Sequence, residues 1–188
     1  MARPREFDVD MALDGAIGVF RERGFEGASA EMLVGAMGIG RQSLYDTFGD
    51  KWGLYRAAVR RYGAREGSAH TKALRSGVRA IDGIEAMLRR VVETADQPCL
   101  GVGSICEFGV SRTDLAEVHA PLAKTLREAI VTRVRDAQRD GDVAADLEPE
   151  TTSEFLIATI TGIRVAGRGG AARAVLTGLA DMALRALR

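Results

Sequence analysis

A short polar segment, Gly38 to Lys51, carries the side chains in this sequence that are best suited to chemistry. It reads GIGRQSLYDTFGDK and places a guanidinium, an amide and a hydroxyl side by side at Arg41, Gln42 and Ser43. Arginine pairs in a bidentate manner with guanine and glutamine with adenine, so the segment favours direct contacts with base edges. Hydroxyl and ammonium groups that suit phosphate contacts follow it closely: Tyr45, Thr47 and Lys51.

Each of these side chains also has an ordinary structural interpretation. Arg41 and Gln42 are long polar residues that suit any solvent-exposed helix face. Phe48 is expected in the core, and Tyr45 is expected to place its ring in the core with its hydroxyl outward. Trp52, the only tryptophan, is expected to pack beneath the N-terminal helices rather than against nucleic acid.

The elements around the segment predict a helix-turn-helix. Apolar residues at helical spacing over 13–20 predict a first helix, which Gly24 is expected to end in a left-handed turn. A second helix, capped by its first residue, is predicted over Ser29–Met37, a third over about 40–47, and a fourth from about residue 50 onward. The third helix is the one that would enter a major groove of DNA.

The remaining sequence continues the helical pattern. Apolar residues recur at helical spacing within 81–92, 115–134, 155–163 and 175–187, and they almost never alternate as in strands. The pattern therefore predicts an all-α protein of about nine helices. A small, polar stretch at 63–78 indicates a boundary along the fourth helix.

Composition limits the class of protein. A chain of 188 residues with 46% hydrophobic content can bury a core, and its formal net charge is zero. Positive charge is local, because the range 41–65 holds six cations and two acids. The sequence lacks an eighteen-residue apolar stretch, and its start, MARPREFDVD, lacks the apolar region of a signal peptide. We therefore expect a cytoplasmic protein without a membrane partner, which also fits its two cysteines.

The sequence carries no recognisable catalytic or metal-binding motif. It has no G-x-S-x-G elbow and no phosphate-binding glycine loop. His70 and His119 are isolated, and no H-x-x-x-H or C-x-x-C spacing supplies metal ligands. We therefore expect no enzymatic activity, no cofactor and no metal.

The segment PCLGVGSICEFG contains both cysteines and one acid. On a single helix Cys99 and Cys106 would lie about 10 Å apart along the axis, too far for a disulfide. A neighbouring proline and glycine indicate that Cys99 lies in a turn, which leaves pairing open; the ordinary interpretation is two small buried hydrophobic residues. Glu107 is expected either to face a ligand pocket or to pair with an arginine such as Arg112.

Residues 13–55 resemble the N-terminal DNA-binding domain of the TetR/AcrR family of transcriptional regulators. The range contains F-x-x-x-G-F, the capping residue Ser29, A-x-G-I, L-Y-x-x-F and the closing Lys51. The resemblance implies a homodimer that holds an inverted-repeat operator as a repressor until a small molecule of unknown identity binds the C-terminal domain. It also implies a DNA-binding domain over 1–50, with Ser29 among its DNA-contacting residues, and a ligand-binding and dimerisation domain over 51–188.

Several positions depart from the usual family pattern. Gly40 replaces a capping serine or threonine, Gln42 replaces a common glycine, and Thr47 replaces a common histidine or tyrosine. The segment that begins at Cys99 resembles the start of the sixth helix in some members, a few of which sense electrophiles through cysteine, although Pro98 replaces their glycine. Two alternatives therefore stay open: a cysteine-based redox or electrophile sensor, and a helical ligand-binding module without DNA affinity.

Two further sets of residues complete the expectations for the C-terminal domain. An apolar ligand pocket is expected to include Met87, Val91, Cys106, Glu107, Phe108, Leu122 and Leu126. A four-helix dimer interface is expected to be built around Phe155, Ile160, Ile163, Leu179 and Met182.

Overall fold

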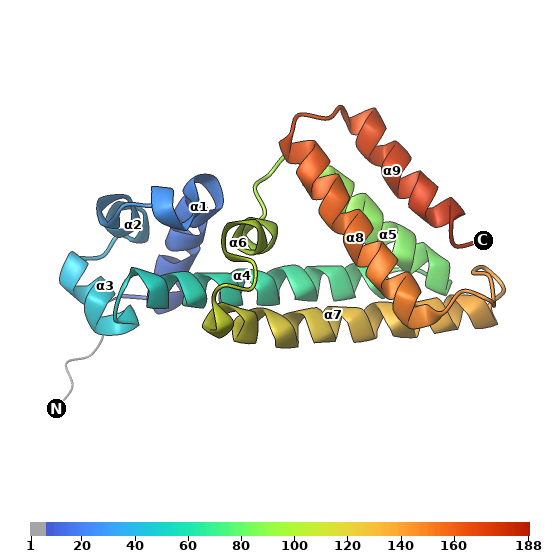
Figure 1. The fold of residues 1–188 in the computed structure, drawn as a ribbon, viewed down its shortest axis with the longest axis horizontal. Coiled ribbons are helices and arrows are strands. Elements are labelled where there is room, and N and C mark those ends of the chain that lie inside the picture. The colour runs from blue at the N-terminus through green and yellow to red at the C-terminus, as the bar shows by residue number, and fades with distance from the viewer. Residues whose placement is uncertain (1–6) are drawn as a thin grey trace. The chain divides into compact units, whose positions relative to one another are not determined.

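The structure, a computed structural model, describes residues 7–188, so part of the N-terminal MARPREFDVD stretch lies outside the described range. Within 7–188 the chain forms nine α-helices and no strand, which confirms the predicted all-α class (Figure 1). The helices are α1 Val9–Gly27, α2 Ala30–Met37, α3 Arg41–Phe48, α4 Lys51–Leu74, α5 Ala80–Glu93, α6 Leu100–Phe108, α7 Thr113–Arg139, α8 Pro149–Arg168 and α9 Arg173–Arg185. None of these described helices is both long enough and apolar enough to cross a bilayer.

The described chain divides into two compact units. Unit 1 comprises residues 7–65 and 99–119, and unit 2 comprises residues 66–98 and 120–188. The division along α4 follows Arg65, within the polar 63–78 stretch. Unit 1 also extends beyond the expected domain of residues 1–50, because it takes in the first part of α4, all of α6 and the start of α7.

Local capping explains most helix boundaries in unit 1. Ser29 caps α2 as predicted, with its hydroxyl oxygen accepting a hydrogen bond from the backbone N–H of Met32 at 3.1 Å. Gly38 ends α2 in the left-handed region, at φ 64° and ψ 28°. The predicted break at Gly24 is present, because this glycine has a positive φ of 68° and kinks α1, but its ψ of −175° lies outside the left-handed helical region and helical structure resumes as far as Gly27.

Close backbone contact between α1 and α2 depends on one glycine. A Cβ atom at Gly15 would lie 2.2 Å from the carbonyl oxygen of Ala36, whereas one at Gly18, a turn further along α1, would meet nothing within 4 Å. The buried side chains of this helical unit include Ala16, Phe20, Leu33 and Leu44. The absence of a side chain at Gly15 therefore lets α2 lie directly against α1.

Unit 2 has an aliphatic core. Its largest fully buried side chains come from α4, α5, α7 and α8: Leu74, Ile84, Met87, Leu88, Ile130, Leu156 and Ile163. Pro149 occupies the first turn of α8, as predicted. Pro121 lies inside α7, a position for proline that the apolar pattern did not predict.

Candidate nucleic-acid interface

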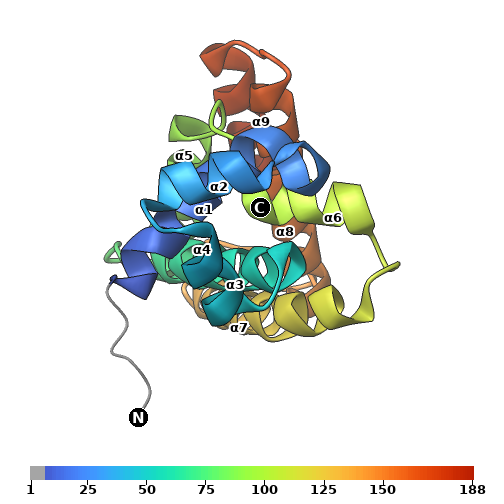
Figure 2. The same cartoon turned by 90° about the vertical axis from the view of Figure 1, so that its left-hand side faces the viewer.

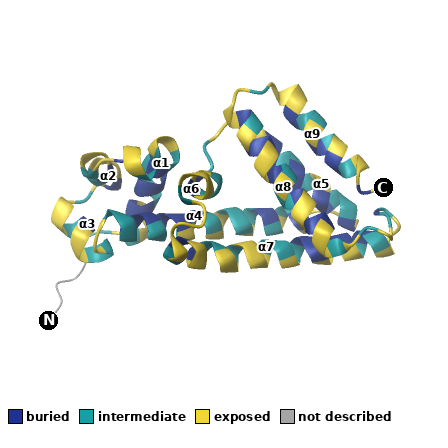
Figure 3. Ribbon diagram, viewed as in Figure 1, coloured by how far each residue is buried: buried dark blue, intermediate teal, exposed yellow. Residues whose placement is uncertain are grey.

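Helix α3 presents polar side chains to solvent in unit 1. Arg41 and Gln42 are exposed at its first turn, and Ser43 beside them is half-buried. Leu44, only 2% exposed, anchors the opposite face of the helix in the core. Figure 2 shows unit 1 from the side of α2 and α3, and Figure 3 shows that both helices carry exposed residues. The two long side chains predicted to contact bases are thus accessible from outside.

The start of α3 has an open backbone end. Gly40 occupies the N-cap position and contributes no side-chain hydrogen bond to the first turn. The first N–H groups of a helix have no intrahelical acceptor, and they carry the positive end of the helix dipole. A glycine cap therefore leaves room for a phosphate or water at this end.

The residues predicted to contact phosphates differ in their surroundings. Tyr45 is 40% exposed, so the expectation that its ring lies in the core is wrong. It follows the buried Leu44 by one position, which turns it about 100° around the helix and away from the core. Thr47 is half-buried, and Ser29 is exposed while its oxygen caps α2. Lys51 is half-buried, with its Nζ atom 4.4 Å from the ring centroid of Phe25.

An aromatic cluster supports the helix-turn-helix from within unit 1. Phe25, Trp52, Tyr55 and Phe108 have ring centroids between 5.1 and 5.7 Å apart in all six pairs. The indole N–H of Trp52 donates to Asp114 at 2.5 Å, and this hydrogen bond is the main cause of the lowered pKa of that carboxyl. Burial raises the pKa of Tyr55 far above its usual range. The predicted packing role of Trp52 is confirmed.

Glu107 bonds the backbone at the kink of α1. Its Oε2 atom accepts a hydrogen bond from the N–H of Phe25 at 3.0 Å, and its Oε1 atom accepts from Phe25 at 3.1 Å and from Glu26 at 3.2 Å. The alternative that Glu107 pairs with Arg112 is wrong. That arginine instead lies 3.7 Å from the ring centroid of Trp52 and 3.5 Å from Asp114. A lone acid in an apolar run was visible in the sequence, but its backbone partners were not.

Much of the local basic excess is paired within unit 1. Asp14 accepts hydrogen bonds from Arg61 at 2.9 and 3.0 Å and from Arg65 at 2.7 Å. The hydrogen bond from Arg61 is the largest cause of the lowered pKa of Asp14. Arg56 lies 3.5 Å from Asp114, and Arg60 is exposed. Salt pairing therefore accounts for most of the arginines that follow α3.

The two cysteines are free thiols. Cys99 occupies the N-cap position of α6 and is half-buried, whereas Cys106 is exposed on the same helix. The interpretation of both as buried hydrophobic residues is therefore wrong. The turn at the start of α6 places Cys99 at the helix end, and Cys106 lies on the solvent side.

The residues expected to line one ligand pocket lie in two different places. In unit 2, Met87 and Val91 are fully buried in the aliphatic core, Leu126 packs against that core, and Leu122 is half-buried. In unit 1, Phe108 belongs to the aromatic cluster, while Cys106 and Glu107 are exposed. Each set is close-packed or exposed in its own unit, so a common ligand-binding role stays a prediction.

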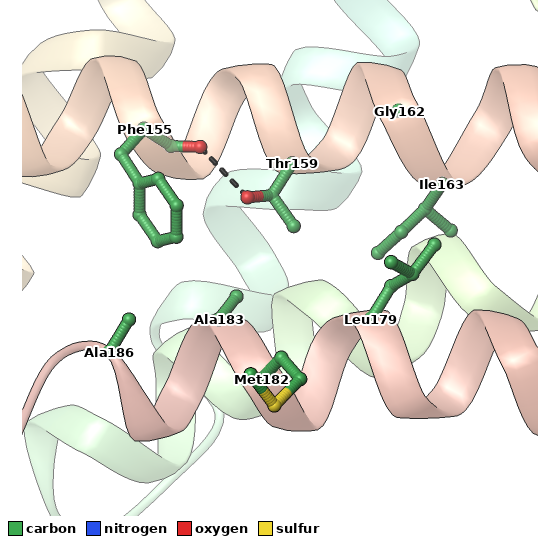
Figure 4. Close-up of a pocket in the computed structure, with 8 residues that line it drawn as sticks. All are labelled: Phe155, Thr159, Gly162, Ile163, Leu179, Met182, Ala183 and Ala186. Carbon is green, nitrogen blue, oxygen red and sulfur yellow. Dashed lines mark hydrogen bonds between the residues drawn. The ribbon is translucent and has the colours of Figure 1, made fainter.

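An apolar groove of about 380 Å³ lies between α8 and α9 in unit 2. Its lining includes four of the five residues expected at a dimer interface: Phe155, Ile163, Leu179 and Met182. In Figure 4, Phe155 and Thr159 extend from α8 toward α9, and Leu179 extends toward Ile163. Ile160 and Ile163 are 7 and 0% exposed and both belong to the unit 2 core, so the exposed part of the expected interface consists of Phe155, Leu179 and Met182, and its role in dimerisation stays a prediction.

The fold and the exposed helix-turn-helix define a class of DNA-binding regulator, and comparison with known proteins gives the family. Residues 12–58 match the family described as bacterial regulatory proteins, tetR family. The chain is 30% identical to the HTH-type transcriptional repressor ComR of Escherichia coli strain K12, over 97% of this chain and 90% of that protein. This protein therefore belongs to the TetR family.

Solved structures agree with this assignment. A cysteine mutant of the TetR-family transcriptional regulator CifR, solved with a 26-base-pair double-strand operator DNA, is 33% identical, with a TM-score of 0.81. The similarity covers 99% of this chain and all of that one. Escherichia coli NemR in its reduced form has a TM-score of 0.80 over 95% of this chain and 94% of its own, but at 18% identity it supports the fold alone.

Proposed function

We propose that this protein is a transcriptional repressor that binds an inverted-repeat operator through α3 of each subunit of a homodimer. The observation that carries the proposal is the exposure of Arg41 and Gln42 at the first turn of α3, where a groove-reading helix contacts bases. Operator DNA in the similar CifR complex supports double-stranded DNA as the partner. We assign base contacts to Arg41, Gln42 and Ser43, and phosphate contacts to Ser29, Tyr45, Thr47 and Lys51.

The apolar surface of α8 and α9 supports the proposed homodimer. Phe155, Leu179 and Met182 are 42, 40 and 61% exposed and lie along one groove. Apolar side chains gathered in this way usually mark an interface, because their exposure to water is unfavourable. Twofold symmetry then requires an inverted repeat, since each half-site faces one subunit.

The proposed regulation is release of the operator by a small molecule bound in unit 2. The protein acts by binding rather than by catalysis, in the compartment that holds the DNA, which in a bacterium is the cytoplasm. The operator is tested by incubating purified protein with fragmented genomic DNA, sequencing the retained fragments and measuring affinity for the enriched site. Retention of no sequence above background would support the alternative of a helical module without DNA affinity.

The free thiols favour one second candidate, a regulator that responds to electrophiles. Cys106 is exposed on α6, one residue before Glu107, whose carboxylate bonds the kink of α1. Alkylation at this position would place a new group beside that contact. Operator affinity measured before and after treatment with N-ethylmaleimide tests the idea, with Cys106→Ser as the control. Unchanged affinity after complete alkylation would exclude it.

A further inference from the structure

A polar cluster in unit 2 joins four ionisable side chains from three helices. Glu66 and His70 lie one turn apart on α4, Arg90 lies on α5, and Arg164 lies on α8. The Glu66 carboxylate accepts hydrogen bonds from Arg90 at 2.8 and 3.3 Å and from Arg164 at 2.6 Å. The Nε2 atom of His70 lies 4.0 Å from the same carboxylate. Two guanidinium groups thus share one carboxylate.

The charges in this cluster do not balance. Burial, with the charge of Arg90 next in size, lowers the pKa of His70 to about 4, so its imidazole is neutral at pH 7. Within residues 7–188, the charged groups that shift this pKa are Arg90, Glu66 and Arg164. Two positive charges against one negative charge leave one positive charge without a counterion inside the cluster.

The cluster also has unused hydrogen-bonding capacity. His70 is 5% exposed, and its Nδ1 atom is enclosed without a hydrogen-bond partner in the described part of the chain. Buried polar atoms are nearly always hydrogen-bonded, so this atom is exceptional. Arg164 is also 5% exposed, and among residues 7–188 its guanidinium, which has five N–H donors, bonds Glu66 through Nη2 alone.

The cluster is partly exposed to solvent. The side chains of Glu66 and Arg90 are 26 and 24% exposed, whereas Arg164 and His70 lie deeper. A bound anion would therefore enter beside Glu66 and Arg90 and extend toward the two buried groups. Burying a charge is costly unless it is paired, so a monoanion of the right shape would relieve the unpaired positive charge.

We propose that this cluster is the anion-binding part of the effector site and that the effector is a small organic carboxylate. The inference rests on the proposed control by a small molecule. A carboxylate supplies the single negative charge that the cluster lacks, and its planar oxygens match a guanidinium group. Glu66 already binds both arginines through a carboxylate, the same chemical group as in the proposed effector.

Matched variants separate this role from general stability. Arg90→Gln and Arg164→Gln each remove one guanidinium group from the cluster. Arg89→Gln is the control, because Arg89 is adjacent in sequence but pairs with Glu85 and Asp181 at the surface. If Arg164→Gln fails to fold because Arg164 is buried, the Arg90→Gln variant provides the test, since Arg90 is more exposed.

The experiment measures the Tm and the binding heat of the full chain with monocarboxylates from acetate to decanoate and with benzoate, each beside its primary amide. We expect at least one carboxylate to raise Tm by about 3 to 6 °C at about ten times its Kd. Its amide should raise Tm by less than about 1 °C, because it lacks the charge. The shift should disappear in Arg90→Gln and persist in Arg89→Gln.

Three results would overturn the inference: an equal shift with the amides, a shift that persists in Arg90→Gln, or no shift with any carboxylate. Operator affinity of the same samples distinguishes this failure from a failure of the proposed function. If the ligand-free protein binds its operator but no carboxylate raises its Tm, only the inference is wrong. If the ligand-free protein retains no DNA, the proposed function itself is wrong.

Discussion

Two exposed surfaces of this protein differ in chemistry, and the difference indicates two kinds of partner. The surface of α3 carries Arg41, Gln42 and Tyr45, which water solvates well. The groove between α8 and α9 carries Phe155 and Met182, which water solvates poorly. Exposure of the first surface is stable in an isolated chain, whereas exposure of the second favours association. We therefore assign a polyanion to the first surface and a second copy of the chain to the second.

The supporting structure behind the two surfaces differs as well. In unit 1, the aromatic cluster is joined by charged contacts such as the Trp52–Asp114 hydrogen bond and the Glu107 contacts with α1. In unit 2, the core is aliphatic, and the buried Arg164 bonds Glu66 beside it. Substitutions in unit 1 should therefore act through directional contacts, and those in unit 2 mainly through packing or charge burial.

The largest expected effect comes from a charge placed in the apolar groove. Leu179→Asp introduces one carboxylate per subunit into the proposed interface. Burial of each charge costs several kcal/mol, so dimerisation should weaken by at least about a thousandfold. Sedimentation velocity across a concentration series measures the change.

The control for this prediction is Val78→Asp. Val78 is fully exposed in unit 2, in the segment that precedes α5, so the variant adds the same charge without touching the groove. It should dimerise like the wild type. A Leu179→Asp protein that stayed dimeric would assign the groove to another partner and remove the basis for the proposed twofold operator.

The next effect in size comes from removing a base contact on α3. Arg41→Ala should cost about 1 to 3 kcal/mol per half-site, because a bidentate contact with guanine is lost. In a dimer whose half-sites act independently, the total is about 2 to 6 kcal/mol. The loss should appear on the operator and relax preference at one base pair, as measured by titration of operator and single-base variants.

Arg75→Ala is the matched control for this substitution. Arg75 is exposed and directly follows α4 in unit 2, so its removal changes net charge equally without altering α3. It should leave the preference for the operator unchanged. Equal losses on operator and random DNA for Arg41→Ala would mean that this arginine positions the helix, and base reading would pass to Gln42 or Ser43.

Local sequence signals predicted the helix-turn-helix better than they predicted its support. Ser29 and Gly38 act through backbone chemistry in their own turn, so their roles follow from the sequence. Glu107 acts on N–H groups 81 and 82 residues away, which no local pattern specifies. Helical periodicity also identifies an apolar face, but it does not show which residues pack against that face. For this reason Phe108 was expected to line a ligand pocket, whereas the structure places it in the aromatic cluster.

A third prediction tests whether α2 is held by close backbone contact. Gly15→Ala places a Cβ atom 2.2 Å from the Ala36 carbonyl oxygen, so α1 and α2 must move apart. We expect the free energy of unfolding to fall by about 1 to 3 kcal/mol, with weaker operator binding. Gly18→Ala is the control on the same helix and should stabilise the protein by about 0.5 to 1 kcal/mol. Chemical denaturation of both variants measures the difference, and equal stabilities would contradict the packing argument.

The smallest expected effect concerns a contact that positions the protein without reading sequence. Lys51 lies at the start of α4 with its Nζ atom near the Phe25 ring, half-buried yet close to α3 along the chain. If its ammonium neutralises one phosphate, Lys51→Ala should reduce the slope of log affinity against log salt by about 0.9 per half-site. At 0.15 M salt this slope corresponds to about a fivefold loss of affinity per half-site. The loss should be equal on operator and random duplexes, in contrast to Arg41→Ala, and fluorescence anisotropy at several salt concentrations measures both quantities.

Lys51→Arg keeps the charge and should retain the slope. An unchanged slope in Lys51→Ala would confine this lysine to its contact with Phe25 and leave the phosphate contacts to Tyr45 and Thr47.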